Sequence, residues 1–210
     1  MFRLFALAAA VSLIAAPAIA GDGVPIVPFD SPIRFTPHMP QVVGADHPFA
    51  GRIAVDPVVG MPDRIGAFLN TFVRPKELNA ALAASIAAAG LAAVDDAAAP
   101  LRLKTTWIAF DSPFKISFSS RASATLRYEL VRRGTGEVIF RRDVTTAAKA
   151  SGGNAADRQR GTARAVISAN LAGAIWCIEQ SPARAAPQDC AVEPVGQFDA
   201  PIIVAIPIYR

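Results

Sequence analysis

Two stretches of alternating apolar and polar residues, joined by a turn, constrain the fold of this chain more than any other feature. In the first stretch, alternate positions are apolar or aromatic: Ala122, Ala124, Leu126, Tyr128 and Leu130. A period of two is typical of a β-strand with one buried and one solvated face. The turn residues Arg133–Gly136 follow, and the chain returns over Glu137–Val144. We therefore predict a β-hairpin over residues 122–144.

A long amphipathic helix is predicted after the hairpin. Residues 149–153 contain Gly and Ser and are interpreted as a linker, and Asn154 is suited to cap a helix. One side of the helix carries a stripe of mostly apolar residues: Ala163, Val166, Ile167, Asn170, Leu171, Ala174 and Ile178. Arg158, Arg160 and Arg164 fall largely on the other side. Such a helix can lie on the apolar face of the hairpin.

Further strands are predicted before the hairpin. Residues 52–59 and 101–108 show strand alternation, and Leu91–Val94 is a shorter candidate. Residues 63–73 are ambiguous, because their apolar residues have helical spacing but Gly66 weakens a helix there.

An earlier helix completes the pattern. Pro75 is tolerated at a first helical position, Leu78, Leu82 and Ile86 recur every four residues, and Gly90 is a natural stop. Together these elements predict an α+β fold, in which two helices pack on one face of an antiparallel sheet of about four to five strands.

Residues 1–20 have the pattern of a secretory signal peptide. Arg3 is followed by the short apolar run Leu4–Ile14, and Ala18–Ala20 fits the small-x-small cleavage rule. A transmembrane anchor is the alternative, but the run is short for a bilayer span of about 20 residues. No other stretch of the sequence is long and apolar enough to predict a membrane span. We therefore expect a periplasmic or secreted protein whose mature chain has no transmembrane segment.

The mature chain divides into a core and two arms. Residues 21–50 are rich in proline and predict an extended N-terminal arm, residues 51–180 form the α+β core domain, and residues 181–210 form a C-terminal arm with an edge strand. The apolar residues of that strand are Ile202, Ile203, Val204, Ile206 and Ile208. Because an exposed apolar edge promotes aggregation, we expect it to pair with the main sheet or with the N-terminal arm.

The two cysteines predict a disulfide. Cys177 lies at the end of the long helix and Cys190 follows beyond a Pro/Ala loop. An oxidising compartment favours joining them. A reactive thiol or a metal pair is the alternative, although neither cysteine has His or acidic residues at ligand spacing.

No motif of catalysis, cofactor binding or metal binding stands out. His38 and His47 lie in the proline-rich arm, and their spacing matches no metal-ligand pattern, even with Asp46 nearby. There is no nucleophile elbow and no phosphate-binding glycine loop. We therefore expect no enzymatic activity, no cofactor and no metal. A net charge of +4 is too small to indicate a nucleic-acid partner.

Two surfaces are candidates for binding a lipid or a partner protein. The first is an apolar flap between strands, formed by Phe110, Phe114, Ile116 and Phe118, with burial in the core as the alternative. The second is a set of cations: Arg102, Lys104, Arg127, Arg132, Arg133, Arg141 and Arg142. Several of them project from the solvated sheet face, where they can meet phosphates of lipid or lipopolysaccharide or simply face water.

Residues 51–180 resemble the small envelope domains of lipopolysaccharide-assembly lipoproteins and of the auxiliary lipoproteins of ABC-type lipid transport. The resemblance lies in the helix that ends at Gly90, in the hairpin strands 126–130 and 135–139, and in the closing helix with Ala165 and Asn170. It implies two helices on one face of an antiparallel sheet. The chain differs in lacking a lipidated cysteine and in having two proline-rich arms.

The sequence thus predicts a non-enzymatic periplasmic accessory protein that binds an envelope protein complex, a lipid or lipopolysaccharide. Two alternatives remain. One is a secreted hydrolase in which His38 or His47 lies next to an acid and a hydroxyl. The other is a structural envelope component that self-associates through its Ile-rich C-terminal edge.

Overall fold

The main sheet has four strands. The computed structural model describes residues 34–35, 41–67, 70–113, 119–151, 154–182, 186–192 and 194–195. The strands are β2 (Ile53–Val55), β5 (Leu101–Asp111), β6 (Ser119–Arg132) and β7 (Val138–Ser151), in the spatial order β2-β5-β6-β7. The last three are antiparallel neighbours, which confirms the hairpin and extends it at both ends.

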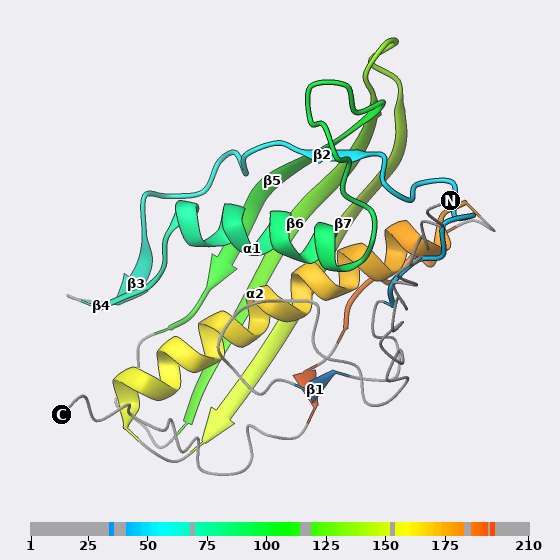
Figure 1. The fold of residues 1–210 in the computed structure, drawn as a ribbon. Coiled ribbons are helices and arrows are strands. Elements are labelled where there is room, and N and C mark those ends of the chain that lie inside the picture. Colours follow the sequence, from blue (N-terminus) through cyan, green and yellow to red (C-terminus); the bar gives the residue numbers. More distant parts are fainter. Residues whose placement is uncertain are drawn as a thin grey trace, which may run out of the picture.

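Two helices, α1 (Pro75–Ala88) and α2 (Ala155–Gln180), cover one face of this sheet (Figure 1). The predicted α+β fold is therefore confirmed. The sheet is mixed rather than antiparallel, because β2 pairs parallel to β5. Parallel neighbours need a long crossover connection, and the segment that contains α1 supplies it between these two strands.

Both helices begin as the sequence predicts. The Asn154 side chain accepts the backbone N–H groups of Ala156 and Asp157, and α2 starts at the next residue. Pro75 is the first residue of α1, and the left-handed Gly90 follows its end at a φ of 76°. The interpretation of residues 149–153 as a linker is wrong for Lys149–Ser151, since β7 continues through them.

Two short sheets lie outside the main one. The ambiguous segment 63–73 forms β3 (Ile65–Ala67) and β4 (Asn70–Val73), an antiparallel pair rather than a helix. β1 (Arg34–Phe35) pairs with β8 (Pro194–Val195), so the N-terminal and C-terminal arms meet. Ala92 makes only an isolated bridge to Ile53, which is less than the strand predicted at 91–94. The predicted edge strand within 201–208 lies outside the described residues.

A buried polar network joins α2 to the hairpin. The Tyr128 hydroxyl donates to Asn170 Oδ1 over 2.8 Å, and Asn170 Nδ2 donates to the carbonyl oxygens of Val144 (2.7 Å) and Ala124 (3.2 Å). The Thr146 hydroxyl donates to the Val166 carbonyl oxygen. Tyr128 and Asn170 are fully buried, and burial raises the pKa of the Tyr128 hydroxyl. The network fixes the position of α2 along the sheet, because each of these groups is costly to leave unpaired.

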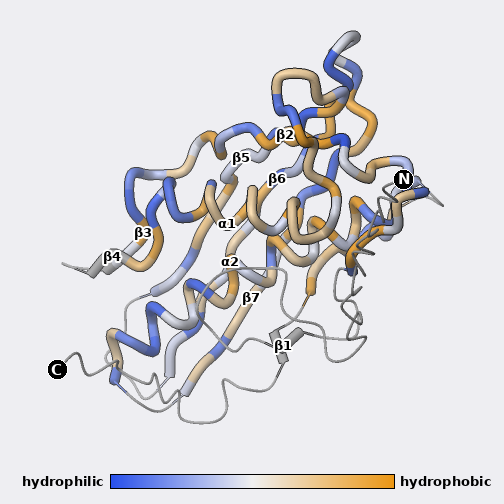
Figure 2. Tube along the Cα trace, in the orientation of Figure 1, coloured by the Kyte–Doolittle hydropathy of each residue, from blue (hydrophilic) through white to orange (hydrophobic). Residues whose placement is uncertain are grey.

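α2 is buried on most of its circumference and not on one stripe alone. The sheet covers one side, while β4, α1 and the C-terminal segment reach others. Hydrophilic residues gather near the start of α2, and its later part is mostly hydrophobic (Figure 2). Arg158, expected on the outer side, is only 3% exposed. By length and composition α2 is also apolar enough to cross a membrane, contrary to the sequence-based expectation. However, 83% of that stretch is buried here, as in the core helix of a folded domain.

Candidate functional site

The helices leave the other face of β5, β6 and β7 open to solvent, and we call this the open face (Figure 1). Strand alternation directs every second side chain to it. Its β6 residues are Arg121, Ser123, Thr125, Arg127 and Glu129, and its β7 residues include Arg141, Asp143, Thr145, Ala147 and Lys149. These positions are exposed or partly exposed, while their neighbours are mostly buried against the helices.

At the hairpin end of the open face, the cations are paired with carboxylates across the strands. Arg127 makes two hydrogen bonds to the Asp143 carboxylate, of 2.7 and 2.8 Å, and Arg141 donates to Glu129 over 2.5 Å. The Arg127 hydrogen bond lowers the pKa of Asp143 below its usual value. The pairing follows from the register, which places Arg127 opposite Asp143 and Glu129 opposite Arg141.

Other cations of the predicted basic set also have partners within the domain. Arg102 pairs with Asp56, Arg132 pairs with Glu137, and the Arg133 guanidinium donates to the backbone carbonyl of Ala97; Arg142 donates to the carbonyls of Ala186 and Pro187. Of the set, Lys104 is the one whose side chain makes no hydrogen bond or ion pair with a described residue. These contacts favour the alternative of a solvated and internally paired surface.

The opposite end of the open face carries two cations that sequence reasoning missed. Arg121 and Lys149 lie directly opposite each other on β6 and β7, and both are exposed. Neither side chain makes an ion pair or hydrogen bond with any residue in the described part of the chain. Cross-strand Cβ atoms lie about 4.5–5.5 Å apart, so the two charges repel. The continued alternation through Ser123 and Ala147 was the signal that could have found them.

The predicted apolar flap is described only in part. Phe110, near the end of β5, is partly buried against the core, and its ring centroid lies 5.9 Å from that of Trp107. A bulge between Trp107 and Ala109 returns Phe110 to the helix-facing side. For this residue the core alternative therefore holds. Phe114, Ile116 and Phe118 lie outside the described residues, and their flap stays a prediction.

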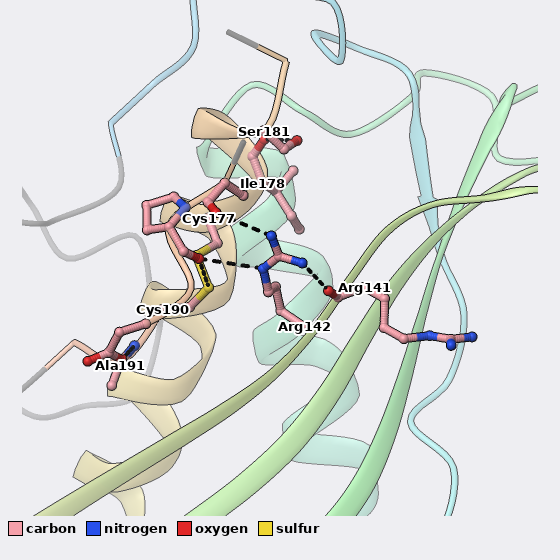
Figure 3. The surroundings of a disulfide bond; sticks show 10 residues. Arg141, Arg142, Cys177, Ile178, Ser181, Cys190 and Ala191 are labelled. Carbon is pink, nitrogen blue, oxygen red and sulfur yellow. Dashed lines mark hydrogen bonds between the residues drawn. A yellow bond between two sulfur atoms is a disulfide. The ribbon is translucent and has the colours of Figure 1, made fainter. Parts of the chain in front are cut away.

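The disulfide between Cys177 and Cys190 is present and ties the chain after α2 back to that helix (Figure 3). The Cα atoms of the two residues are 5.7 Å apart. From β7, the Arg142 guanidinium donates to the carbonyl oxygens of Ala186 (3.2 Å) and Pro187 (3.5 Å). The disulfide and the Arg142 hydrogen bonds together hold the segment from Ala186 to Cys190 close to the first half of β7.

An open hollow lies where this segment approaches β7. Its volume is about 430 Å³, and its lining consists of the consecutive residues Val138–Arg142 together with Ser181 and Ala186. Successive side chains of a strand point to opposite faces. A hollow lined by consecutive residues therefore runs along the edge of β7 rather than over one face of the sheet.

The described part of the chain gives no support to a catalytic histidine. His47 Nε2 lies 3.0 Å from the Glu179 carbonyl oxygen, and its Nδ1 accepts the Phe49 backbone N–H, so the backbone occupies both ring nitrogens. Burial raises the pKa of Glu179 to about 7, and its carboxylate accepts the Gln41 backbone N–H. Among the described residues no group of three His, Cys, Asp or Glu is placed to hold a metal ion. His38 lies outside them.

Comparison with known proteins gives only distant similarities. No family model matches the chain, and no curated protein matches it. A Xanthomonas campestris protein of the DUF330 family is 15% identical, with a TM-score of 0.46 over 71% of this chain and 93% of that one. A minor lipoprotein from Acinetobacter baumannii is 12% identical, with a TM-score of 0.43 over 63% and 95%. At such scores the similarity supports no assignment of function, and nothing in it concerns lipopolysaccharide assembly.

Proposed function

We propose that this protein is a non-enzymatic accessory protein of the bacterial envelope that binds anionic lipid headgroups through the open face of its sheet. The predicted signal peptide and the disulfide support export to an oxidising compartment. The observation that carries the proposal is the exposed cross-strand pair Arg121 and Lys149, which has no carboxylate partner in the described chain.

A phosphate group suits the space between these two side chains. The Arg121 guanidinium can donate two hydrogen bonds to one phosphate, and the Lys149 ammonium can supply a second positive charge. A bound anion removes the repulsion between the two cations. The same face holds ion pairs at its hairpin end, so we expect lipid contact mainly at the Arg121 end.

The surroundings of the pair suit an approach to a lipid surface. The open face has short side chains between its two ends, so little side-chain bulk rises above the backbone there. These residues are Ser123, Thr125, Thr145 and Ala147. In the sequence, the apolar residues Phe114, Ile116 and Phe118 come just before β6, which begins two residues before Arg121. A sequence that places apolar residues close to cations suits the interface between lipid and water.

The test is co-sedimentation of the mature chain, from Gly21 onward, with vesicles that contain phosphatidylglycerol or only phosphatidylcholine. Each basic residue near an anionic surface contributes about 1 kcal/mol, so Arg121→Gln with Lys149→Gln should weaken binding to the anionic vesicles roughly 30-fold. The matched control is Lys76→Gln with Arg64→Gln, which removes the same charge at exposed positions outside the open face and should change binding less than threefold. Equal losses in the two variants would contradict the proposal.

A further inference from the structure

A carboxylate lies beside the cation pair on the open face. The register between β5 and β6 places Asp111 opposite Ser123, which follows Arg121 by two residues on β6. Residues that lie directly opposite each other share a face of the sheet, so Asp111 projects on the same side as Arg121. Asp111 is exposed, and its carboxylate makes no ion pair or hydrogen bond with any residue that the structure describes.

The positions of these charges leave space for a ligand between them. Asp111 and Arg121 are diagonal neighbours on adjacent strands, and such positions lie about 7–8 Å apart. Lys149 lies opposite Arg121 and one strand further from Asp111. The surface beside the cation pair is formed by Ser123 and Ala147, which lie opposite each other and have short side chains. We call these five residues the mixed-charge patch.

A ligand that carries both charges fits this patch better than a phosphate alone. Asp111 repels any anion that Arg121 holds, so a site for phosphate alone would be stronger without this carboxylate. In ethanolamine phosphate an ethylene linker joins the phosphate to an ammonium group. With the phosphate between Arg121 and Lys149, the linker can lie over Ser123 and bring the ammonium to Asp111. Each charged group of the ligand then lies next to an opposite charge.

The side chains of the open face favour the primary ammonium of ethanolamine over the quaternary ammonium of choline. A primary ammonium has N–H groups that donate to a carboxylate, and choline has none. Proteins commonly recognise choline through aromatic faces. The aromatic residues within β5, β6 and β7 all share the helix-facing side by their register: Trp107, Phe110, Tyr128 and Phe140. The described strands therefore present no aromatic surface to a choline group on the open face.

Two apolar residues next to Asp111 favour a headgroup that belongs to a membrane lipid. Ile108, the extra residue of the β5 bulge, is 47% exposed. Ala109 lies opposite Thr125 and is also exposed. Apolar residues beside charged groups suit the interface between lipid and water. A soluble ethanolamine phosphate has no apolar part that would contact them.

We propose that the mixed-charge patch binds the ethanolamine phosphate headgroup of a phospholipid. Arg121 and Lys149 hold the phosphate, the Asp111 carboxylate accepts hydrogen bonds from the ammonium, and the Ser123 hydroxyl donates to a phosphate oxygen. This assignment rests on the proposed contact between the open face and lipid, and it adds the identity of the headgroup.

Vesicles of equal anionic charge test the headgroup. Both kinds contain the same fraction of phosphatidylglycerol, and the remaining lipid is either phosphatidylethanolamine or phosphatidylcholine. The mature chain from Gly21 onward should bind the ethanolamine vesicles about threefold more tightly, which is the gain expected from one exposed ion pair. Equal binding to both kinds would overturn the headgroup assignment, and the proposed contact with anionic lipid would stand.

A single substitution tests whether Asp111 causes the preference. Asp111→Asn should abolish the preference, and it should strengthen binding to the choline vesicles because the carboxylate no longer repels phosphatidylglycerol. Asp63→Asn is the matched control, since it removes an exposed carboxylate outside the open face, and it should keep the preference. A preference that persists in Asp111→Asn would overturn the assignment. If Arg121→Gln with Lys149→Gln left binding to both kinds unchanged, the proposed function would fail as well.

Soluble headgroups separate recognition from the effect of phosphatidylethanolamine on bilayer packing. In nuclear magnetic resonance spectra, glycerophosphoethanolamine should shift the backbone amide signals of Asp111, Arg121 and Lys149 more than glycerophosphocholine does. Equal shifts would contradict recognition of the ammonium. Tighter binding of the soluble headgroup than of the vesicles would show that the ligand is a soluble phosphate ester, and it would overturn the assignment to a membrane lipid.

Discussion

Asn170 is the residue on which the packing of α2 depends most. Its amide is fully buried and bonds to Tyr128, to backbone carbonyls of β6 and β7, and to Thr146 Oγ1. The sequence placed this residue on the apolar stripe of a helix but did not reveal its partners, because those depend on how the helix lies along the hairpin.

Replacement of this amide should therefore be costly. Asn170→Ala leaves the Tyr128 hydroxyl and two backbone carbonyls without their donor or acceptor, and it should lower the free energy of unfolding by about 2–4 kcal/mol. Ser168→Ala is the control on the same helix, since the buried Ser168 hydroxyl has no hydrogen-bond partner, and it should cost less than about 1 kcal/mol. Urea unfolding measures both, and similar costs would show that the network contributes little.

Glu179 should make stability depend on pH. Burial raises its pKa from an ordinary 4.5 to about 7. At pH values between these two, the folded protein therefore holds a proton on Glu179 that the unfolded chain has lost. The stabilisation is complete below about pH 4.5 and is lost as pH rises through 7. After allowance for partial exposure, the loss is about 1–2 kcal/mol.

Urea unfolding at pH 5 and pH 8 provides the measurement. Glu179→Gln keeps an acceptor for the Gln41 amide and should show a smaller decrease in the free energy of unfolding between these pH values. If the free energy of unfolding decreased equally in both proteins, ionisation of Glu179 in the folded state would not lower stability, which contradicts the prediction.

At the scale of elements, the segment that follows α2 passes very close to the helix at Cys190, and the helix needs a small residue at that point. Gly173 is the contact point, because any side chain there meets the Cys190 carbonyl group. The disulfide fixes that carbonyl, so the neighbouring backbone has little freedom to move away.

Gly173→Ala should therefore destabilise the protein by about 1–3 kcal/mol, although alanine favours a helix over glycine. A double-mutant cycle isolates the cause. In a background with Cys177→Ser and Cys190→Ser, the released segment can shift, and the same Gly173→Ala change should cost at least about 1 kcal/mol less. Equal costs in both backgrounds would show that the clash does not depend on the disulfide.

The sequence predicted helices and strands well where the hydrophobic periodicity was strong. It predicted them less well where tertiary contacts determine the bounds or the direction of a strand. The alternation at Leu126, Tyr128 and Leu130 was enough for the hairpin, and Asn154 and Pro75 marked both helix starts. The end of β7 was missed because Ala, Lys and Ser carry little hydrophobic contrast. The parallel β2 was missed because strand direction follows from the crossover and not from local pattern.

At the scale of the whole molecule, the two ends of the open face differ in charge. The hairpin end carries ion pairs, and the opposite end carries Arg121 and Lys149. The set of cations chosen from sequence proved to be mostly paired, because the partner of each arginine is decided by register between distant strands. The same register brings Arg121 and Lys149 opposite each other, and Asp111, which lies opposite Ser123 on the same face, makes no ion pair with either of them. A candidate site of this kind follows from the sequence only after the hairpin has been aligned residue by residue.

The most direct test of lipid contact uses a photo-crosslinking amino acid in place of Ala147, on the open face two residues before Lys149, or in place of Ala83, exposed on α1. With vesicles that contain phosphatidylglycerol, we expect lipid adducts from position 147 and almost none from position 83. Adducts that form equally at both positions, or mainly at 83, would show that the open face is not the surface that meets the membrane.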